Sequence, residues 1–276
     1  MSNAPQASLL PDGRRLHLHH GPIDLILGVD GGDREACFAQ AKQRFETVLT
    51  GLVAHLPALR QPVDNAEFSD AVAQRMQAAV FAHRGCFVTP MAAVAGAVAD
   101  DVLAAMIAGQ DVARAYVNNG GDIAFHLAPG ARFAALGPAG EITFEASDAA
   151  RGIATSGWRG RSYSLGIADA VSVAARSAAE ADVAATLIAN AVDLPGHHGI
   201  TRAPANEVSP DSDLGARLVT VAVAGLSPRD VERALQRGLE QAAQMRDAGL
   251  ILDAVLSLSG QCRALSPEQN GALSYA

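Results

Sequence analysis

The sequence predicts an α+β fold in which largely antiparallel sheets pack against helices. Helical periodicity dominates residues 33–109, short strand-like runs follow, and a strand, a helix and a further strand close the chain. This grouping differs from the regular alternation of strands and helices that builds a doubly wound parallel sheet. Since 276 residues can bury a large core, we expect a single domain over residues 1–276, with two intimately packed halves as the alternative.

The N-terminal part is expected to form a pair of strands and three helices. Strand-like runs at 14–20 and 23–29 flank a Gly-Pro pair, which predicts a hairpin. Asp33 is a suitable N-cap for a helix that ends near Pro57, and a second helix covers about 66–83. The pair Thr89-Pro90 supplies a cap and a proline at the first helical position, so the third helix runs from there to about Gly109.

The middle of the chain is expected to form an antiparallel meander. Its predicted strands lie at 115–118, 122–127, 132–136, 142–145, 152–155 and 170–175. Ser177 and Glu180 give a capping-box pattern that begins a helix ending near Ala191.

The C-terminal part is expected to begin with a long loop over 193–213, because this segment is rich in Pro, Gly, His and Asp. A strand at 217–223, a helix over 227–249 and a strand at 251–258 follow. The tail, 264–276, is expected to be frayed.

Composition excludes several classes of function. The net charge is −8 and no Lys/Arg run occurs, which argues against a nucleic-acid partner because such proteins need a basic patch. The three cysteines, Cys37, Cys86 and Cys262, lack any C-x-x-C spacing, so we expect neither a disulfide framework nor a thiolate metal site. We therefore expect a protein of the reducing cytoplasm.

A membrane partner is not expected. The N-terminus lacks the continuous apolar stretch of a signal peptide. The most apolar later segment, 91–108, is interrupted by Asp100 and Asp101. The low aromatic content of 4% means that Ala, Val, Leu and Ile fill the core.

Asn118-Asn119-Gly120-Gly121-Asp122 lies between two predicted strands. One interpretation is a tight hairpin turn, because Asn and Gly tolerate positive φ. The other is a ligand site, in which bare glycine backbone passes a ring system and the Asn119 and Asp122 side chains bind polar groups.

The segment 154–162 combines hydroxyls, glycines and two arginines. Backbone N–H groups and guanidinium groups can converge on one anion, so Thr155, Ser156, Gly157, Arg159 and Arg161 are candidates for a phosphate site. An exposed polar loop is the alternative.

Asp182 and Thr186 lie four residues apart on one face of a predicted helix. A carboxylate and a hydroxyl are hard oxygen donors that suit Mg²⁺. The alternative is that Asp182 only complements the helix dipole. The small residues that follow Pro90 indicate close helix packing or, alternatively, a flat cofactor over the helix start.

Three segments together resemble the ApbE-like superfamily, whose founding members are Mg²⁺-dependent transferases that move FMN from FAD to a hydroxyl of a target protein. The matching segments are Asn118 to Asp122, the Ala-Thr-Ser-Gly run at 154–157, and the helix with Asp182 and Thr186. The resemblance covers roughly residues 89–191. It implies an ApbE-like α+β fold, a flavin nucleotide (FAD or FMN), Mg²⁺ and an acceptor protein.

The sequence also departs from the transferases. Ala95 stands where they carry a lysine, and the loop with His and Asp that precedes their metal helix is replaced here by Ser164 to Asp169. The variants therefore indicate a side branch of the superfamily rather than the transferases proper.

The resemblance implies one pocket between the Pro90 helix, the Asn118 turn, the Thr155 loop and the Asp182 helix. There the arginines of the 154–162 loop meet phosphate, and Asp182, Thr186 and the carbonyl of Val94 hold Mg²⁺. Asp169 is the candidate proton acceptor. Three functions stay open: a flavin transferase with altered catalytic residues, a non-catalytic flavin carrier or sensor, and a different small-molecule enzyme on this scaffold. A homodimer is conceivable from the high alanine content.

Overall fold

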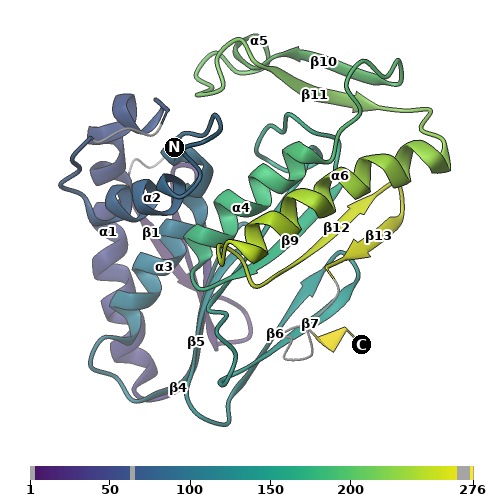
Figure 1. Ribbon diagram of the computed structural model, residues 1–276. Helices are drawn as coiled ribbons and strands as arrows, with labels where there is room; N and C mark the ends of the chain where they lie inside the picture. Colours follow the sequence, from purple (N-terminus) through teal and green to yellow (C-terminus); the bar gives the residue numbers. More distant parts are fainter. Residues whose placement is uncertain (1–3, 63–65, 266–273, 276) are drawn as a thin grey trace.

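The fold was analysed in a computed structural model that describes residues 4–62, 66–265 and 274–275. Its main element is a nine-stranded sheet with the order β1-β2-β3-β4-β5-β8-β9-β12-β13, in which every neighbouring pair is antiparallel (Figure 1). These strands are Gln6–Leu9, Arg15–His20, Ile23–Gly31, Val112–Asn119, Asp122–Leu127, Gly152–Ser156, Ala170–Ala175, Asp253–Leu258 and Gln261–Ala264. The predicted α+β class with largely antiparallel sheets is confirmed.

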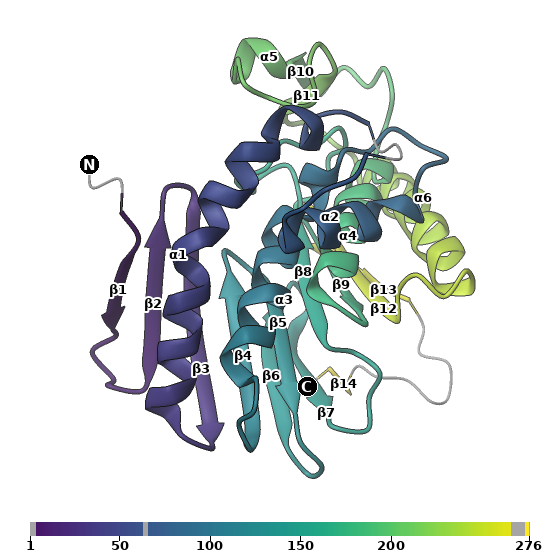
Figure 2. The same cartoon turned by 90° about the vertical axis from the view of Figure 1, so that its left-hand side faces the viewer.

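Helices cover one face of this sheet. They are α1 (Arg34–Leu59), α2 (Ala71–Phe81), a short 3-10 turn (Pro90–Ala93) continued by α3 (Val94–Ile107), α4 (Ala178–Ala191) and α6 (Pro228–Asp247). Figure 2 shows α1 crossing the face of β2 and β3, which it also contacts. The opposite face is covered in part by a small sheet of β6 (Arg132–Gly137), β7 (Gly140–Glu145) and β14 (Ser274–Tyr275).

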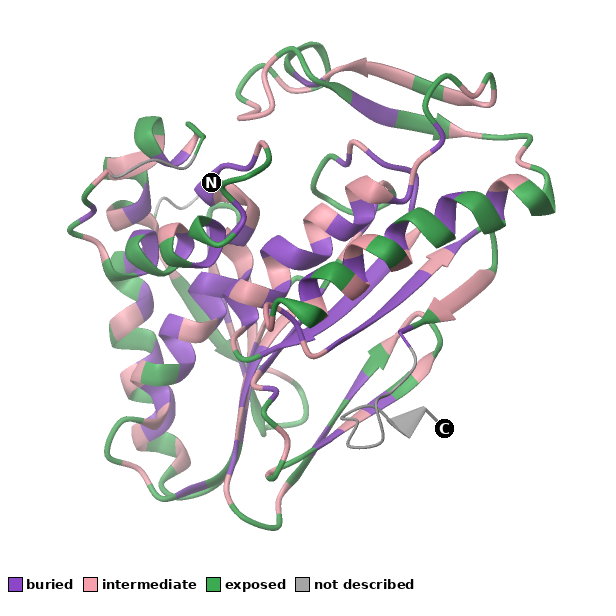
Figure 3. Ribbon diagram, viewed as in Figure 1, coloured by how far each residue is buried: buried purple, intermediate pink, exposed green. Residues whose placement is uncertain are grey.

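The helix-covered core falls into two clusters, with buried residues facing the sheet (Figure 3). One joins α1, α2 and α3 to β2, β3 and β4, and includes Phe45, Met76 and Val102. The other joins α4 and α6 to β8, β9 and β12, and includes Ile188 and Leu235. Aliphatic and alanine side chains dominate both, as the composition predicts.

Some sequence-predicted elements need correction. The meander is interrupted, because the β6–β7 hairpin leaves the large sheet and β8 pairs directly with β5. The predicted loop at 193–213 contains β10 (Ile200–Pro204) and α5 (Ala205–Val208), and β10 pairs with β11 (Leu218–Val223) in a separate two-stranded sheet. The sequence analysis did not predict β13, because its four residues show no clear hydrophobic period.

The tail expected to be frayed is described only in part. Ala264 ends β13, Leu265 is buried, and the backbone of β14 pairs with β7. Residues 266–273 and 276 lie outside the described residues.

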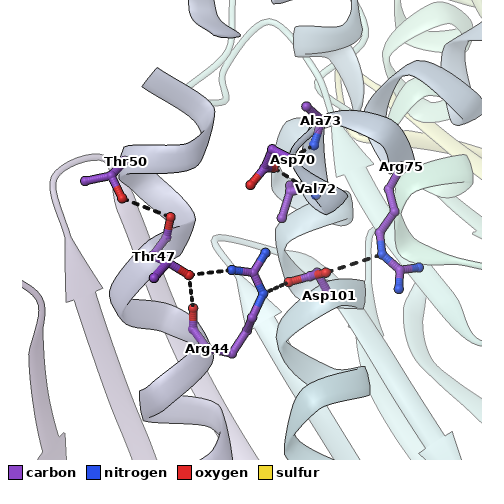
Figure 4. Close-up of polar contacts among 8 residues, drawn as sticks. All are labelled: Arg44, Thr47, Thr50, Asp70, Val72, Ala73, Arg75 and Asp101. Atoms are coloured by element: carbon purple, nitrogen blue, oxygen red, sulfur yellow. Dashed lines mark hydrogen bonds and ion pairs between the residues drawn. The ribbon is translucent and has the colours of Figure 1, made fainter. Parts of the chain in front are cut away.

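Asp101 on α3 holds three helices together (Figure 4). Only 6% of this residue is exposed, and its carboxylate accepts from Arg44 Nε on α1 at 2.5 Å. Arg75 Nε on α2 lies 3.6 Å from the other carboxylate oxygen. Because a buried charge is tolerated only when it is paired, the two arginines make this aspartate a structural element of the fold.

Within the described residues, one segment has the length and hydropathy of a membrane span, Pro90–Ile107. In the structure 56% of it is buried inside the protein, where α3 packs against α1, α4 and the sheet. Its apolar character is consistent with the core helix of a soluble protein.

Candidate functional site

A cavity of about 280 Å³ lies where the start of α3 meets α4 and the start of β5. Asp122, Asp182 and Thr186 line it, together with Val94 and Ala95 of α3. The structure therefore brings together the three residues that the sequence analysis named as oxygen donors. The remaining wall comes from Met91 and Ala92, from Ser162 and Tyr163, and from Ser209, Ser212, Asp213 and Leu214.

Asp182 has one oxygen committed to the fold. Its Oδ2 accepts the backbone N–H of Gly96 at 3.0 Å, in the first turn of α3. Burial and the nearby negative charge of Asp122 raise the pKa of the Asp182 carboxyl well above its usual value, against the lowering effect of the Gly96 and Ala95 N–H groups. The Asp182 side chain also lines the cavity, so the carboxylate is shared between the start of α3 and the cavity.

Asp122 is the second carboxylate of the cavity. Its Oδ1 accepts the backbone N–H of Thr155 at 3.2 Å, so β5 and β8 are joined beside the site. Burial raises the pKa of Asp122 to about 7, although the Thr155 N–H and the Arg161 charge act in the opposite direction. Two carboxylates thus share one poorly solvated space, and each disfavours ionisation of the other.

Helices α3 and α4 cap each other at this site. Asp182 of α4 accepts from Gly96 in α3, and Asp100 of α3 accepts from the N–H groups of Ala178 and Ala179 in α4 at 3.0 and 2.9 Å. A Cβ on Gly96 would lie 2.2 Å from the carbonyl oxygen of Ala178. The small residues after Pro90 therefore serve close helix packing, and Asp182 satisfies an N–H group at the start of the neighbouring helix α3 while it lines the cavity.

The Asn118 to Asp122 segment is the tight turn between β4 and β5. Gly120 and Gly121 have φ of +67° and +116°, and Asn118 Oδ1 accepts from the Gly121 N–H at 2.8 Å. Asn119 is buried and donates from Nδ2 to the carbonyl of Ala95 at 3.1 Å. The turn interpretation is thus realised in the fold, and Asn119 fixes the hairpin against the start of α3.

Arg161 lies over this turn. Its guanidinium occupies the space that a Cβ on Gly120 would need, at 1.9 Å from the built position. It is exposed and its charge acts on Asp122. Arg161 is therefore the cation of the 154–162 loop that stands beside the cavity.

Residues 157–159 of this loop are engaged outside the cavity lining. Arg159 Nε and Trp158 Nε1 donate to Asp169 Oδ1 at 2.7 and 3.2 Å, and the N–H of Ser259 donates to Oδ2 of the same residue. A Cβ on Gly157 would lie 2.4 Å from the Asp169 carbonyl oxygen. The carboxylate of Asp169, the candidate proton acceptor, thus accepts hydrogen bonds from Arg159, Trp158 and Ser259. Asp169 is absent from the lining of the cavity.

Thr155 and Ser156 end strand β8 next to the site. The Thr155 hydroxyl is 2.6 Å from the Ser172 hydroxyl, so it is engaged with β9. Neither residue lines the cavity. Their assignment to a phosphate site stays a prediction, as do those of Gly157 and Arg159.

The segment 209–214 is the part of the site that sequence reasoning missed. Asp213 lines the cavity and its Oδ2 accepts from the Thr89 hydroxyl at 2.5 Å, which ties the segment to the start of the Pro90 turn. Thr89, expected to cap that turn, forms no side-chain cap. The alternating Ser and Asp residues at 209–213 were the available signal, but nothing in the sequence joined them to the other motifs.

His197 and His198 behave as loop residues. Their rings stack with centroids 4.7 Å apart, and His197 Nε2 lies 3.4 Å from Asp230. No group of three His, Cys, Asp or Glu side chains suited to a metal ion occurs in the part of the chain that the structure describes.

The donors of the cavity suit a hard divalent cation bound together with a ligand. Two carboxylates and the Thr186 hydroxyl are the oxygen ligands that Mg²⁺ prefers, and Mg²⁺ commonly keeps waters or substrate phosphates in its remaining positions. No lysine or arginine is among the lining residues to neutralise the carboxylates. The donor set therefore fits Mg²⁺ better than it fits a transition metal.

Comparisons with known proteins place the chain in context. A family profile described as "AbpE bacteria" matches residues 7–264. A UPF0280 protein of Methanopyrus kandleri is 35% identical over 175 residues, which are 60% of this chain and 69% of that protein. A UPF0280 protein of Methanococcoides burtonii is 35% identical over 154 residues, which are 53% of this chain and 64% of that protein. A mutant of a flavin transferase ApbE from Vibrio cholerae superimposes with a TM-score of 0.48 at 12% identity, covering 95% of this chain and 96% of its own.

Proposed function

Since the chain belongs to the AbpE bacteria family, and so to the ApbE-like superfamily, we propose that it binds a flavin nucleotide, FAD or FMN, together with Mg²⁺. The observation that carries the proposal is the pair of carboxylates, Asp122 and Asp182, which line one cavity without a cationic side chain in its wall. A divalent cation would stabilise both, and nucleotide phosphates would complete its ligands.

The proposal gives each named residue a role. Asp182, Thr186 and the carbonyl of Val94 hold Mg²⁺, and Asp122 binds it directly or through water. Arg161 meets phosphate, because its exposed guanidinium stands beside the cavity. When bound, Mg²⁺ would neutralise phosphate charge in any phosphoryl transfer.

The remaining contacts that we propose depend on where the ring system of the flavin lies. The ring system would pass the backbone of Gly120 and Gly121, where the space at Gly121 is open and the Arg161 guanidinium, which covers Gly120, would have to move. Thr155, Ser156, Gly157 and Arg159 would bind through a rearranged 154–162 loop, and Asn119 would bind once its Nδ2 is released from the Ala95 carbonyl. Release of Arg159 from Asp169 would supply the second phosphate cation and free the Asp169 carboxylate as a proton acceptor.

Transfer of FMN to an acceptor protein is one form of this function, and non-catalytic flavin carriage or sensing is the other. Ala95 in the place of the transferase lysine favours the second form, because a methyl side chain cannot supply the charge or the hydrogen bonds of an amino group. A different small-molecule enzyme on the same scaffold predicts no flavin affinity. The three free cysteines fit a reducing compartment, and we place the protein in the cytoplasm.

Calorimetric titration with FAD, with and without Mg²⁺, tests the proposal. We expect Mg²⁺ to tighten FAD binding in the natural chain and to have no effect in Asp182→Ala. Arg132→Gln, an exposed arginine of β6 outside the cavity lining, serves as the comparison for the loss of one arginine. Absence of FAD and FMN binding under all of these conditions removes the proposal, while AMP release from FAD with a flavinylated protein product selects the transferase form.

A further inference from the structure

A second cavity, of about 550 Å³, lies between the loop that follows α2 and the C-terminal halves of α4 and α6. It shares no lining residue with the acidic cavity. Its volume is within the range of small-molecule sites. The two cavities are neighbours along α4, because Asp182, Thr186 and Asn190 are spaced four residues apart on one face of that helix.

His83 marks this second cavity as built for a polar ligand. Its residue exposure is 9%, it lines the cavity, and its ring forms no hydrogen bond or ion pair with the described residues, so the ring nitrogens open on the cavity. Because protein covers most of the residue, a ligand in the cavity is the partner best placed to hydrogen-bond these nitrogens. Burial lowers the pKa of His83, which keeps the ring neutral, with one donor and one acceptor nitrogen.

Three amide side chains join His83 as polar groups in the wall of this cavity. Asn190 Oδ1 accepts from the Leu165 N–H at 2.8 Å and from the Ser164 hydroxyl at 3.2 Å, which fixes the amide orientation and leaves Nδ2 as a donor. Gln241 and Gln244 of α6 also line the cavity. Amides and a neutral imidazole both donate and accept, so they match an edge with alternating donors and acceptors.

The remaining walls are apolar and carry no charge. Leu165, Leu187, Met245 and Leu250 form them, and no Asp, Glu, Lys or Arg lines the cavity. A charged ligand group buried here would have no counter-charge, whereas a flat ring would bury apolar surface against leucine and methionine.

We propose that the cavity bounded by His83, Asn190 and Gln241 binds an uncharged planar heterocycle of the nucleobase type. The heterocycle enters either as a free base or nucleoside or as the base at the end of a nucleotide whose phosphates lie in the acidic cavity. The proposal rests on the contents of this cavity and does not require the proposed flavin function.

Ligand-observed NMR and calorimetry with adenine test this proposal. Indole is the comparison ligand, because it is a fused two-ring compound of similar size that lacks adenine's row of donors and acceptors. We expect adenine to bind at least about tenfold more tightly than indole, because indole leaves the polar side chains of the cavity without hydrogen-bond partners. His83→Leu and Gln241→Leu should each weaken adenine binding about tenfold. Gln236→Leu on the outer side of α6 is the matched control and should change nothing.

Cys86 reports where the probe binds. It is exposed and lines the cavity, whereas Cys37 is buried in the core. Adenine should slow alkylation of Cys86 by iodoacetamide, and Cys37 should stay unlabelled as long as the protein is folded. Equal binding of indole, undiminished adenine binding in both leucine variants, or an unchanged rate at Cys86 overturns the proposal.

The Asp182→Asn variant distinguishes a free base or nucleoside from the base of a nucleotide. This variant should bind adenine normally, since it lies outside the cavity, so a failed flavin proposal leaves the result intact. Competition between FAD with Mg²⁺ and adenine in the natural chain, lost in Asp182→Asn, identifies the base as part of the nucleotide. Adenine binding without such competition identifies a free base or nucleoside.

Discussion

Two aspartates on neighbouring helices, Asp101 and Asp182, show how differently one chain treats a buried carboxylate. Asp101 is paired with Arg44 at 2.5 Å and lies 3.6 Å from Arg75, so the fold supplies its cations. Asp182 faces a second carboxylate, Asp122, across a cavity whose lining has no arginine or lysine. The difference separates a carboxylate that stabilises the fold from one that is poised for an external cation.

Removing the paired carboxylate should have the largest effect. We expect Asp101→Ala to lower the free energy of unfolding by about 2–3 kcal/mol, less than for a fully buried pair because the arginines are partly exposed. Urea unfolding followed by circular dichroism measures it. A loss no larger than that of an exposed-site control such as Glu35→Ala would contradict the structural role of Asp101.

Removing the unpaired carboxylate should act in the opposite direction. Without Mg²⁺, Asp182→Asn should raise the free energy of unfolding by about 1–2 kcal/mol, because an amide keeps the Gly96 contact without charge repulsion. Added Mg²⁺ should raise the Tm of the natural chain but not of the variant. A variant that is less stable than the natural chain at pH 8 would mean that helix capping outweighs the repulsion.

The pH dependence of stability sharpens the same contrast. Since the pKa of Asp122 is raised to about 7, the folded state takes up protons at a higher pH than the unfolded state does. Metal-free protein should therefore lose stability as the pH rises from about 4 to 7, by about 1 kcal/mol for this group after allowance for water in the cavity.

Asp122→Asn should flatten this part of the pH profile. Mg²⁺ should raise the Tm more at pH 8 than at pH 6, because protons compete for the same oxygens. A profile that is identical in the variant, measured by urea titrations across this range, would show that Asp122 titrates normally.

The smallest effect is expected at the rim of the acidic cavity. Asp213→Asn should change the free energy of unfolding by no more than about 0.5 kcal/mol, because an amide oxygen still accepts from the Thr89 hydroxyl. If Asp213 adds to the negative charge that attracts Mg²⁺, the Mg²⁺ midpoint in a Tm titration should shift by about twofold. A complete loss of the Mg²⁺ response would instead make Asp213 a ligand.

Local patterns predicted most of the fold because its elements carry their own signals. Asp33 and Ser177 cap helices as expected, and the turn glycines at 120 and 121 have the positive φ that their sequence suggests. The strands β6 and β7 were predicted, but their place in a separate sheet was not, and β10 was not predicted at all, because these features depend on contacts distant in sequence, such as the pairing of β5 with β8.

The site was predictable where a residue and its neighbours share one helix or turn. Asp182, Thr186 and Asp122 meet in one cavity, whereas Asp213 joins them only through the packing of a segment that carries no motif. Asp169 and Arg159 illustrate the reverse case, since their bond to each other is a long-range consequence of loop packing. The second cavity had no sequence signal, because His83 was expected at the end of one helix and Gln241 within another, and no motif connects them.

The mutual capping of α3 and α4 has an evolutionary consequence. Gly96 and Ala178 lie in the first turns of their helices, and each is followed four residues later by an aspartate that binds the other helix, Asp100 and Asp182. The two contacts are thus reciprocal, yet only Asp182 opens on the acidic cavity. The Asp100 contact can keep the helices joined while mutations around Asp182 change the ligand that the cavity binds.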